Sequence, residues 1–187
     1  GNFNPVHLAH LVMADQVQNQ LGLDKVYLMP TYLPPHVDEK KTISSEHRLA
    51  MLELAVADNP CLDIEPIELI RKGKSYTYDT MKALKEANPD TDYYFIIGGD
   101  MVEYLPKWHR IDDLLHLVQF VGIRRPNYPT ESTYPIIWVD VPQMAISSTL
   151  IRQKVKSGCS IRYLLPENVI NYIQEKGLYQ DELDNKL

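Results

Sequence analysis

Short apolar runs alternate with helical segments along this 187-residue chain, and no other feature constrains its fold as strongly. The expected strands lie at 25–29, 62–65, 93–97, 118–123 and 136–139. They are continuous apolar runs rather than alternations of apolar and polar residues, as expected when helices cover both faces of a parallel sheet. The sequence therefore predicts one α/β domain over residues 1–187, built on a doubly wound parallel sheet, with a frayed tail at 181–187.

Helical spacing and capping residues predict the segments between these strands. The expected helices run from 8 to 21, from 44 or 45 to about 59, from 77 to 87, from 148 to 156 and from 167 to 176. Gly22 and Gly177 follow the first and last helices as C-terminal stop signals. In doubly wound sheets ligands bind beyond the carboxyl ends of the strands. Those ends correspond here to 1–10, 30–36, 98–100 and the segment before 148.

Charge and composition restrict the class of protein. The chain carries 19 Lys and Arg against 25 Asp and Glu, a net charge of −6, which argues against a general nucleic-acid-binding surface. No apolar run approaches the roughly 20 residues that span a bilayer, and no signal segment opens the chain. Cys61 and Cys159 lack CxxC spacing, so reduced thiols are expected. These features predict a cytoplasmic protein with no nucleic-acid or membrane partner. They are compatible with a homo-oligomer.

Two histidines stand three residues apart where the opening loop becomes the first helix. In Gly-Asn-Phe-Asn-Pro-Val-His-Leu-Ala-His this spacing puts the rings of His7 and His10 on one face of the first turn. A helix N-terminus offers free N–H groups and the positive end of the dipole, so two imidazole donors there favour phosphate. For either histidine alone, a solvated or capping role is the plain alternative. A zinc pair is disfavoured, because HExxH sites place the histidines at i and i+4 with Glu between them.

A second polar cluster opens the helix near the other end of the chain. Ile146-Ser-Ser-Thr-Leu-Ile-Arg152 presents three hydroxyls at the expected helix start, and Arg152 lies one turn after Ser148. Helix capping explains one or two of these hydroxyls. The arginine on the same face as Ser148 suits a polyphosphate, which hydroxyls, N–H groups and a guanidinium could hold together.

Together these motifs resemble the nucleotidyltransferases that carry a His-x-x-His phosphate motif and a C-terminal Ile-Ser-Ser-Thr-x-x-Arg motif. Over essentially the whole chain the sequence is similar to the bacterial nicotinate mononucleotide adenylyltransferases, a family with a Rossmann-like fold. The supporting segments are Leu-Pro-Pro-His at 33–36, Arg48 in His-Arg-Leu-Ala-Met-Leu, 75–80, 97–100, 106–109 and Arg-Pro at 125–126.

The resemblance implies an ATP site. Its catalytic residues would be His7, His10 and Arg152, with His7 on the α-phosphate and the other two on the β and γ groups beside Ser148. The full set implied to bind ATP is Gly1, Phe3, His7, His10, Gly98, Asp100, Ile146, Ser147, Ser148 and Arg152, with Gly98 and Asp100 near the adenosine ribose. No protein metal ligand is implied. Mg²⁺ is expected to arrive on the ATP phosphates, because no dedicated carboxylate cage is visible.

The resemblance also implies a site for nicotinate mononucleotide. Trp108 would stack on the pyridine ring, while backbone N–H groups near Thr77 and His109 would receive the nicotinate carboxylate. The implied set is Asn2, His36, Ser75, Tyr76, Thr77, Trp108 and His109. Without the resemblance, Trp108 is better explained as a half-buried packing residue.

Several positions depart from the family pattern. Ala9 stands where Gly is common, Asn4 where Asp is common, and Val37 where Lys or Arg is usual. Asn4 removes one negative charge beside the phosphates. Gly1 matches the phosphate-loop glycine that follows a first strand in the family, so that strand is expected upstream of the sequence.

The implied reaction is in-line attack of the mononucleotide 5′-phosphate on the α-phosphorus of ATP, which releases pyrophosphate. Because the attacking phosphate is already ionised, positioning and charge stabilisation suffice and no general base is required. Transfer to nicotinamide mononucleotide or phosphopantetheine is an alternative. A metal-dependent hydrolase with His7, His10 and His36 as ligands is a rival of another class, and a nucleotide-binding regulatory module without turnover is a third.

Overall fold

The structure is a computed structural model that describes residues 1–32 and 43–180. The sequence-derived assignments at His36, Val37 and the tail at 181–187 lie outside the described residues. The chain divides into two compact units, one formed by Gly1–Lys74 with Pro142–Leu187 and the other by Ser75–Val141. Each unit has its own parallel sheet and its own buried core, and each is described by itself.

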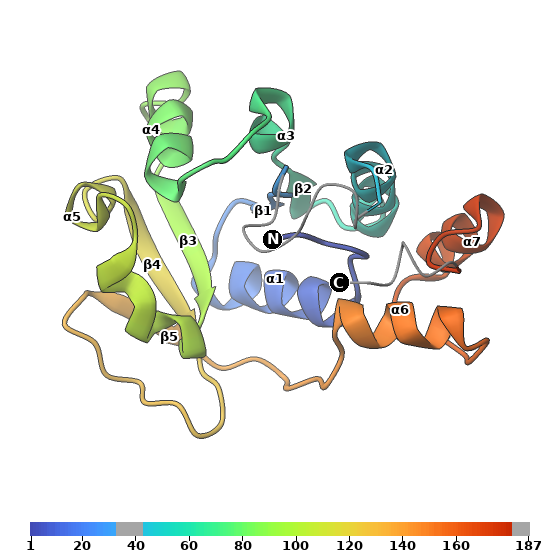
Figure 1. Ribbon diagram of the computed structural model, residues 1–187. Coiled ribbons are helices and arrows are strands. Elements are labelled where there is room, and N and C mark those ends of the chain that lie inside the picture. The colour runs from blue at the N-terminus through green and yellow to red at the C-terminus, as the bar shows by residue number, and fades with distance from the viewer. Residues whose placement is uncertain (33–42, 181–187) are drawn as a thin grey trace. The chain divides into compact units, whose positions relative to one another are not determined.

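The first unit holds a two-stranded parallel sheet and most of the longer helices. Its elements are α1 (Leu8–Leu21), β1 (Val26–Leu28), α2 (Ser45–Val56), β2 (Leu62–Ile64), α3 (Ile67–Arg71), α6 (Ser148–Lys156) and α7 (Glu167–Lys176) (Figure 1). β1 and β2 pair in parallel, with Val26 opposite Leu62. The core includes fully buried side chains from several helices, among them Val17, Met51, Leu52, Ile151 and Ile173.

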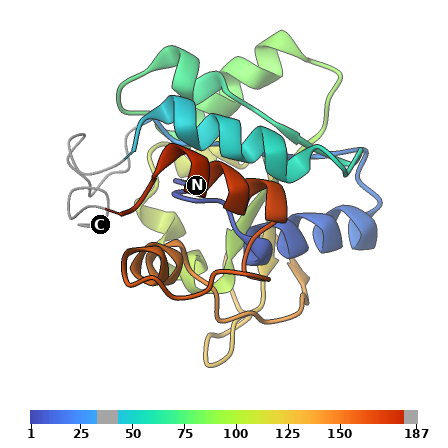
Figure 2. The same cartoon turned by 90° about the vertical axis from the view of Figure 1, so that its right-hand side faces the viewer.

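Helices α2 and α7 lie side by side in this unit (Figure 2). The Tyr172 hydroxyl is 2.7 Å from His47 Nδ1, and the Asn168 amide donates to the Leu54 carbonyl at 2.8 Å. Ser44 caps α2 by accepting a hydrogen bond from the N–H of His47. The C-terminal helix is therefore fixed to the body of the unit by specific polar contacts as well as by apolar packing.

The second unit is a three-stranded parallel sheet with short helices. Its elements are α4 (Thr77–Ala87), β3 (Tyr93–Gly98), the 3₁₀ helix η2 (Gly99–Lys107), α5 (Ile111–Leu114), β4 (Val118–Ile123) and β5 (Ile136–Val139) (Figure 1). The strand order is β3-β4-β5, with Tyr93 opposite Val118 and Phe120 opposite Ile136. A Cβ on Gly122 would lie 2.9 Å from Trp138 and Ile136 side-chain atoms, so glycine lets β5 side chains cover the middle of β4.

The alternation of strands and helices is confirmed, and every strand pair is parallel as predicted. The predicted strand at 93–97 runs one residue further, because Gly98 still pairs with Ile123 of β4. The elements α3, η2 and α5 were not predicted. Each is short, and η2 contains Pro106, which sequence rules treat as a helix breaker.

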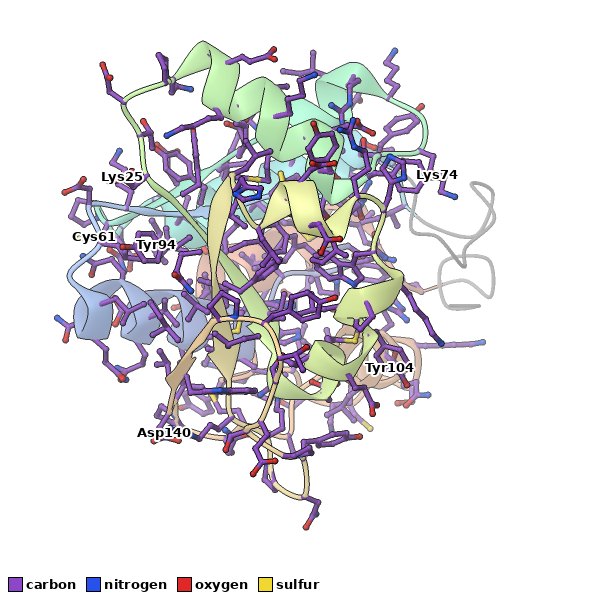
Figure 3. The ribbon with its side chains drawn as sticks, turned by 90° about the vertical axis from the view of Figure 1, so that its left-hand side faces the viewer. Lys25, Cys61, Lys74, Tyr94, Tyr104 and Asp140 are labelled. Carbon is purple, nitrogen blue, oxygen red and sulfur yellow. The ribbon has the colours of Figure 1, made fainter. Side chains whose placement is uncertain are left out.

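Both cysteines are free thiols, Cys61 partly buried and Cys159 exposed. The N–H of Val26 donates a hydrogen bond to the Cys61 carbonyl at the start of the two-stranded sheet. Figure 3 labels Cys61 and Lys25, the residue before Val26. Among residues 1–32 and 43–180, no helix combines the length and the apolar character needed to cross a lipid bilayer.

Candidate active site

The two histidines of the first unit stack on each other at the start of α1. Their ring centroids are 3.7 Å apart with an interplanar angle of 24°, and Phe3 meets the His10 ring edge-on at 4.8 Å. His7 is buried, with 5% of its surface exposed. Both rings therefore lie on one face of the first turn, as their spacing predicted.

Burial sets the charge of the two rings, and a hydrogen bond sets the tautomer of His10. Burial lowers the pKa of His7 to about 4, and burial together with the neighbouring His7 lowers the pKa of His10 to about 3. Both rings are therefore neutral at pH 7. His10 Nδ1 accepts a hydrogen bond from the backbone N–H of His7 at 3.1 Å, so the proton of the neutral ring lies on Nε2. His7 Nδ1 is buried without a hydrogen-bond partner among the described residues.

The hydroxyl cluster at the start of α6 packs against the opening loop. The Ser147 hydroxyl caps the helix by accepting from the N–H of Leu150, and the Ser148 hydroxyl donates to the Pro5 carbonyl at 2.7 Å. Arg152 is 4% exposed. Its Nη1 donates to the Asn4 carbonyl at 2.8 Å and its Nη2 to the Thr149 hydroxyl at 3.1 Å. The structure thus brings the two predicted motifs together and shows that Ser148 and Arg152 hold the opening loop.

A second buried arginine holds the same loop from α2. Arg48 is fully buried, and its Nη1 donates to the carbonyls of Asn2 at 2.8 Å and Thr31 at 2.7 Å. Its Nη2 reaches the Tyr32 carbonyl and the Ser45 hydroxyl. Burial lowers the pKa of this guanidinium, and no described carboxylate pairs with it. Arg48 therefore places a positive charge beneath the opening loop.

The backbone carbonyls of this loop are mostly occupied by donors from other segments. The Gly1 carbonyl accepts from the N–H of Thr31, and the carbonyls of Asn2, Asn4 and Pro5 accept from the two arginines and Ser148. Phe3, which is buried, has φ +50°, in the left-handed region. In such a loop the carbonyls are already bonded to other segments, and one residue has a left-handed backbone conformation. The N–H groups of the loop can then turn toward an anion.

Ile146, just before α6, is partly buried.

In the second unit, Gly98 and Asp100 lie where β3 gives way to η2. Asp100 Oδ1 is 3.8 Å from Arg125 Nε, and both side chains are partly exposed. A Cβ on Gly98 would lie 2.5 Å from Asp100 Oδ1, so only glycine leaves this carboxylate in place. On Gly99 a Cβ would lie 2.7 Å from the Ile123 carbonyl, so η2 approaches β4 closely.

Aromatic side chains gather around the other end of η2. Trp108 is half-buried and meets the rings of Phe95 and Phe120 at 5.9 and 5.8 Å, edge-on in both cases. The rings of Tyr76 and His109 are 4.4 Å apart. The packing role expected for Trp108 from sequence alone is therefore present, and it fixes the orientation of the indole.

The start of α4 adds polar groups to this aromatic cluster. Tyr76 is the N-terminal capping position and Thr77 the first helical residue, so N–H groups that have no acceptor within the helix itself begin next to the Tyr76–His109 ring contact. Ser75 Oγ is buried and has no hydrogen-bond partner among the described residues. Within this unit the structure brings Tyr76, Thr77 and His109 together. Tyr104, on the same 3₁₀ helix as Asp100, is exposed (Figure 3).

Comparison with known proteins identifies the family of the chain. A cytidylyltransferase-like family model matches residues 1–154. Proteins named "probable nicotinate-nucleotide adenylyltransferase" from Streptococcus pneumoniae and Streptococcus mutans are 63% identical to the chain over 179 and 180 residues, which cover 96% of this chain and 86% of each relative. The chain belongs to the nicotinate-nucleotide adenylyltransferase family.

Solved structures agree on the fold of this family. The nicotinic acid mononucleotide adenylyltransferase of Plasmodium falciparum, complexed with NaAD, matches with a TM-score of 0.78 at 19% identity, covering 98% of this chain and 96% of that one. A structure of that enzyme complexed with APC matches equally well. The chain accordingly has a Rossmann-like α/β fold, as the sequence predicted. Its membership of the family makes it a nucleotidyltransferase, so the hypothesis of a metal-dependent hydrolase is not supported.

Two of the side chains that hold the opening loop of this nucleotidyltransferase were not assigned a role from the sequence. The sequence pattern around Arg48 indicated no role for it, and nothing in the sequence pointed to Tyr179, whose hydroxyl donates to Asn4 Oδ1. A signal for Arg48 existed. It precedes Leu52 by four residues and Ala55 by seven, so helical spacing puts a charged residue on the apolar face of α2.

Proposed function

We propose that the protein transfers the adenylyl group of ATP to nicotinate mononucleotide, forming nicotinate adenine dinucleotide and releasing pyrophosphate. The observation that carries this proposal is the 63% identity, over 96% of the chain, to relatives named for that reaction. The geometry adds support, because each unit presents groups suited to one part of the chemistry.

The opening loop and α1 of the first unit are assigned to the ATP phosphates. His10 offers an Nε2–H donor, and His7 has a buried ring nitrogen without a partner among the described residues. Two neutral imidazoles donate hydrogen bonds without the cost of burying two further cations. The positive end of α1 and the buried guanidiniums of Arg48 and Arg152 supply favourable potential for a polyanion. We therefore assign His7, His10, Ser147, Ser148 and Arg152 to this half of the reaction.

The second unit is assigned to the acceptor ring and the adenosine ribose. Trp108 offers an aromatic surface whose orientation is set by Phe95 and Phe120. The first turn of α4 beside His109 offers N–H groups to a carboxylate, which favours nicotinate over the uncharged carboxamide of nicotinamide. Asp100, in the first turn of η2 just after β3, is suited to accept hydrogen bonds from ribose hydroxyls.

The chain supplies positioning and electrostatics rather than a nucleophile. The attacking 5′-phosphate is ionised at neutral pH, so the residues assigned above need only hold two polyanions in line and stabilise charge that develops on the α-phosphate and the leaving pyrophosphate. Among the described residues, no group of three or more His, Cys, Asp or Glu side chains could hold a metal ion. Mg²⁺ bound through the ATP phosphates and water would neutralise part of the developing charge.

Pyrophosphate release from ATP tests the proposal. The purified protein is offered nicotinate mononucleotide, nicotinamide mononucleotide, phosphopantetheine or no acceptor, with Mg²⁺ present. We expect release with nicotinate mononucleotide far above the other three, and a product with the mass of nicotinate adenine dinucleotide. Preference for another acceptor would contradict the assigned substrate, and ATP binding without release would indicate a regulatory module. We also propose the cytoplasm as its location, which its two free thiols suit.

A further inference from the structure

Tyr179 lies beyond the last helix and reaches back to the opening loop. Its side chain is fully buried, and its hydroxyl donates to Asn4 Oδ1 at 2.7 Å, across 175 residues of sequence. Its backbone has φ +64°, a left-handed conformation that is unfavourable for a residue with a Cβ. Such a conformation persists where tertiary contacts determine it. The hydrogen bond from the Tyr179 hydroxyl to Asn4 is one such tertiary contact.

Asn4 is held from two sides at once. Its side-chain oxygen accepts from Tyr179, and its main-chain carbonyl accepts from Arg152 Nη1 at 2.8 Å. Only 1% of Asn4 is exposed. Both of its oxygens carry partial negative charge three residues before His7, so donors that engage them reduce repulsion of an incoming phosphate.

The tyrosine also lies within electrostatic reach of both buried arginines. Burial lowers the pKa of Arg48 and of Arg152, and interaction with Tyr179 acts in the opposite direction for each. The three side chains come from α2, from α6 and from the segment after α7. They converge on the Asn2 and Asn4 segment, which leads directly to the histidines.

We propose that Tyr179 is a positioning residue for ATP, acting through Asn4 to set the conformation of the phosphate-binding loop. It does not touch substrate. The inference rests on the proposed function for the identity of the reaction, but ATP affinity measures it independently of the acceptor. Tyr179 also lies beyond the residues 1–154 that the cytidylyltransferase-like model matches. The segment after α6 would thus contribute to the site, and not only to stability.

A single-atom change with a matched control tests this role. Tyr179→Phe removes only the hydroxyl, and Tyr172→Phe removes another hydroxyl from the same C-terminal segment, one that contacts His47 at the same 2.7 Å. We expect Tyr179→Phe to weaken ATP binding by about tenfold, the loss of one well-formed hydrogen bond. Its kcat should fall while the KM for nicotinate mononucleotide stays unchanged. Tyr172→Phe should keep ATP affinity within about twofold of the parent.

A double-mutant cycle tests whether Tyr179 acts through Asn4. We expect Asn4→Ala to weaken ATP binding at least as much as Tyr179→Phe, and the double variant to be no worse than Asn4→Ala. Independent, multiplying effects would overturn the inference, as would equal ATP affinities of the Tyr179→Phe and Tyr172→Phe variants. Should Tyr179→Phe fail to fold, Asn4→Ala with parental ATP affinity would overturn it alone. A parent protein that binds ATP but uses another acceptor would contradict the proposed function and leave this inference intact.

Discussion

Single side chains in the opening loop carry the strongest functional expectations, and His7 is the first. Its buried ring nitrogen has no partner among the described residues, and it is assigned to the α-phosphate. We expect His7→Ala to lower kcat by roughly 10²- to 10³-fold, as for the loss of one donor to developing negative charge. Binding of nicotinate mononucleotide, measured by calorimetry, should change little. His116→Ala, which alters an exposed histidine of the second unit, is the control. Near-parental turnover of the His7 variant would contradict its role.

The two depressed histidine pKa values also make stability depend on pH. In the unfolded chain both rings bind protons below their ordinary pKa of about 6.5, whereas the folded protein resists protonation until about pH 4 for His7 and about pH 3 for His10. The unfolded state therefore binds more protons as the pH falls through this window, and stability is lost. We expect the free energy of unfolding to be about 2–3 kcal/mol lower at pH 5.5 than at pH 7.5.

Urea denaturation at the two pH values measures this loss. His10→Asn should reduce it, because one of the two titrating rings is then absent. The same denaturation series on His116→Ala should keep the full loss, since that residue is exposed. An equal free energy of unfolding of the parent protein at both pH values would contradict the conclusion that His7 and His10 are buried in the neutral form.

At the scale of elements, η2 depends on a close approach that only glycine permits. A Cβ on Gly99 would lie 2.7 Å from the Ile123 carbonyl, a backbone atom of β4 that cannot rotate away. We expect Gly99→Ala to destabilise the protein by about 1–3 kcal/mol, the usual range for overpacking, and to reduce activity by displacing Asp100 and Trp108. Thermal unfolding and the KM values measure both effects. Tyr104→Ala, at an exposed position on the same 3₁₀ helix, should leave both within error, and a stable, active Gly99→Ala variant would contradict the argument.

The elements also show what local sequence can predict. Strands β4 and β5 and helices α4, α6 and α7 occupy the predicted ranges, because apolar runs, capping residues and stop glycines are local signals. The 3₁₀ helix η2 was missed since its form depends on Gly99 meeting β4, a contact between distant residues. In the same way, the sequence indicated that Ser148 and Arg152 belong with His7, but the direction of their hydrogen bonds toward the Pro5 and Asn4 carbonyls depends on tertiary structure.

At the scale of the whole molecule, a net charge of −6 coexists with a site assigned to polyanions. Charged groups close to the site, rather than the net charge, explain how the two can coexist. The first unit buries Arg48 and Arg152 beneath one loop, and for Arg48 the described partners are carbonyl and hydroxyl oxygens. Burying a cation costs free energy that neutral oxygens offset only in part, so an anion at the loop should stabilise the folded chain.

This coupling predicts that ATP raises the thermal unfolding midpoint much more than AMP does. A ligand that binds only the folded state adds about 2.7 kcal/mol of stability at about 100 times its Kd. AMP lacks the β- and γ-phosphates assigned to His10, Ser148 and Arg152, so at equal concentration its shift should be small. Differential scanning fluorimetry at low and high salt measures both, and the ATP shift should shrink in high salt because the attraction is partly electrostatic. Equal shifts from ATP and AMP would indicate that the protein recognises the part that the two ligands share. That result would contradict the assignment of the opening loop to the β- and γ-phosphates.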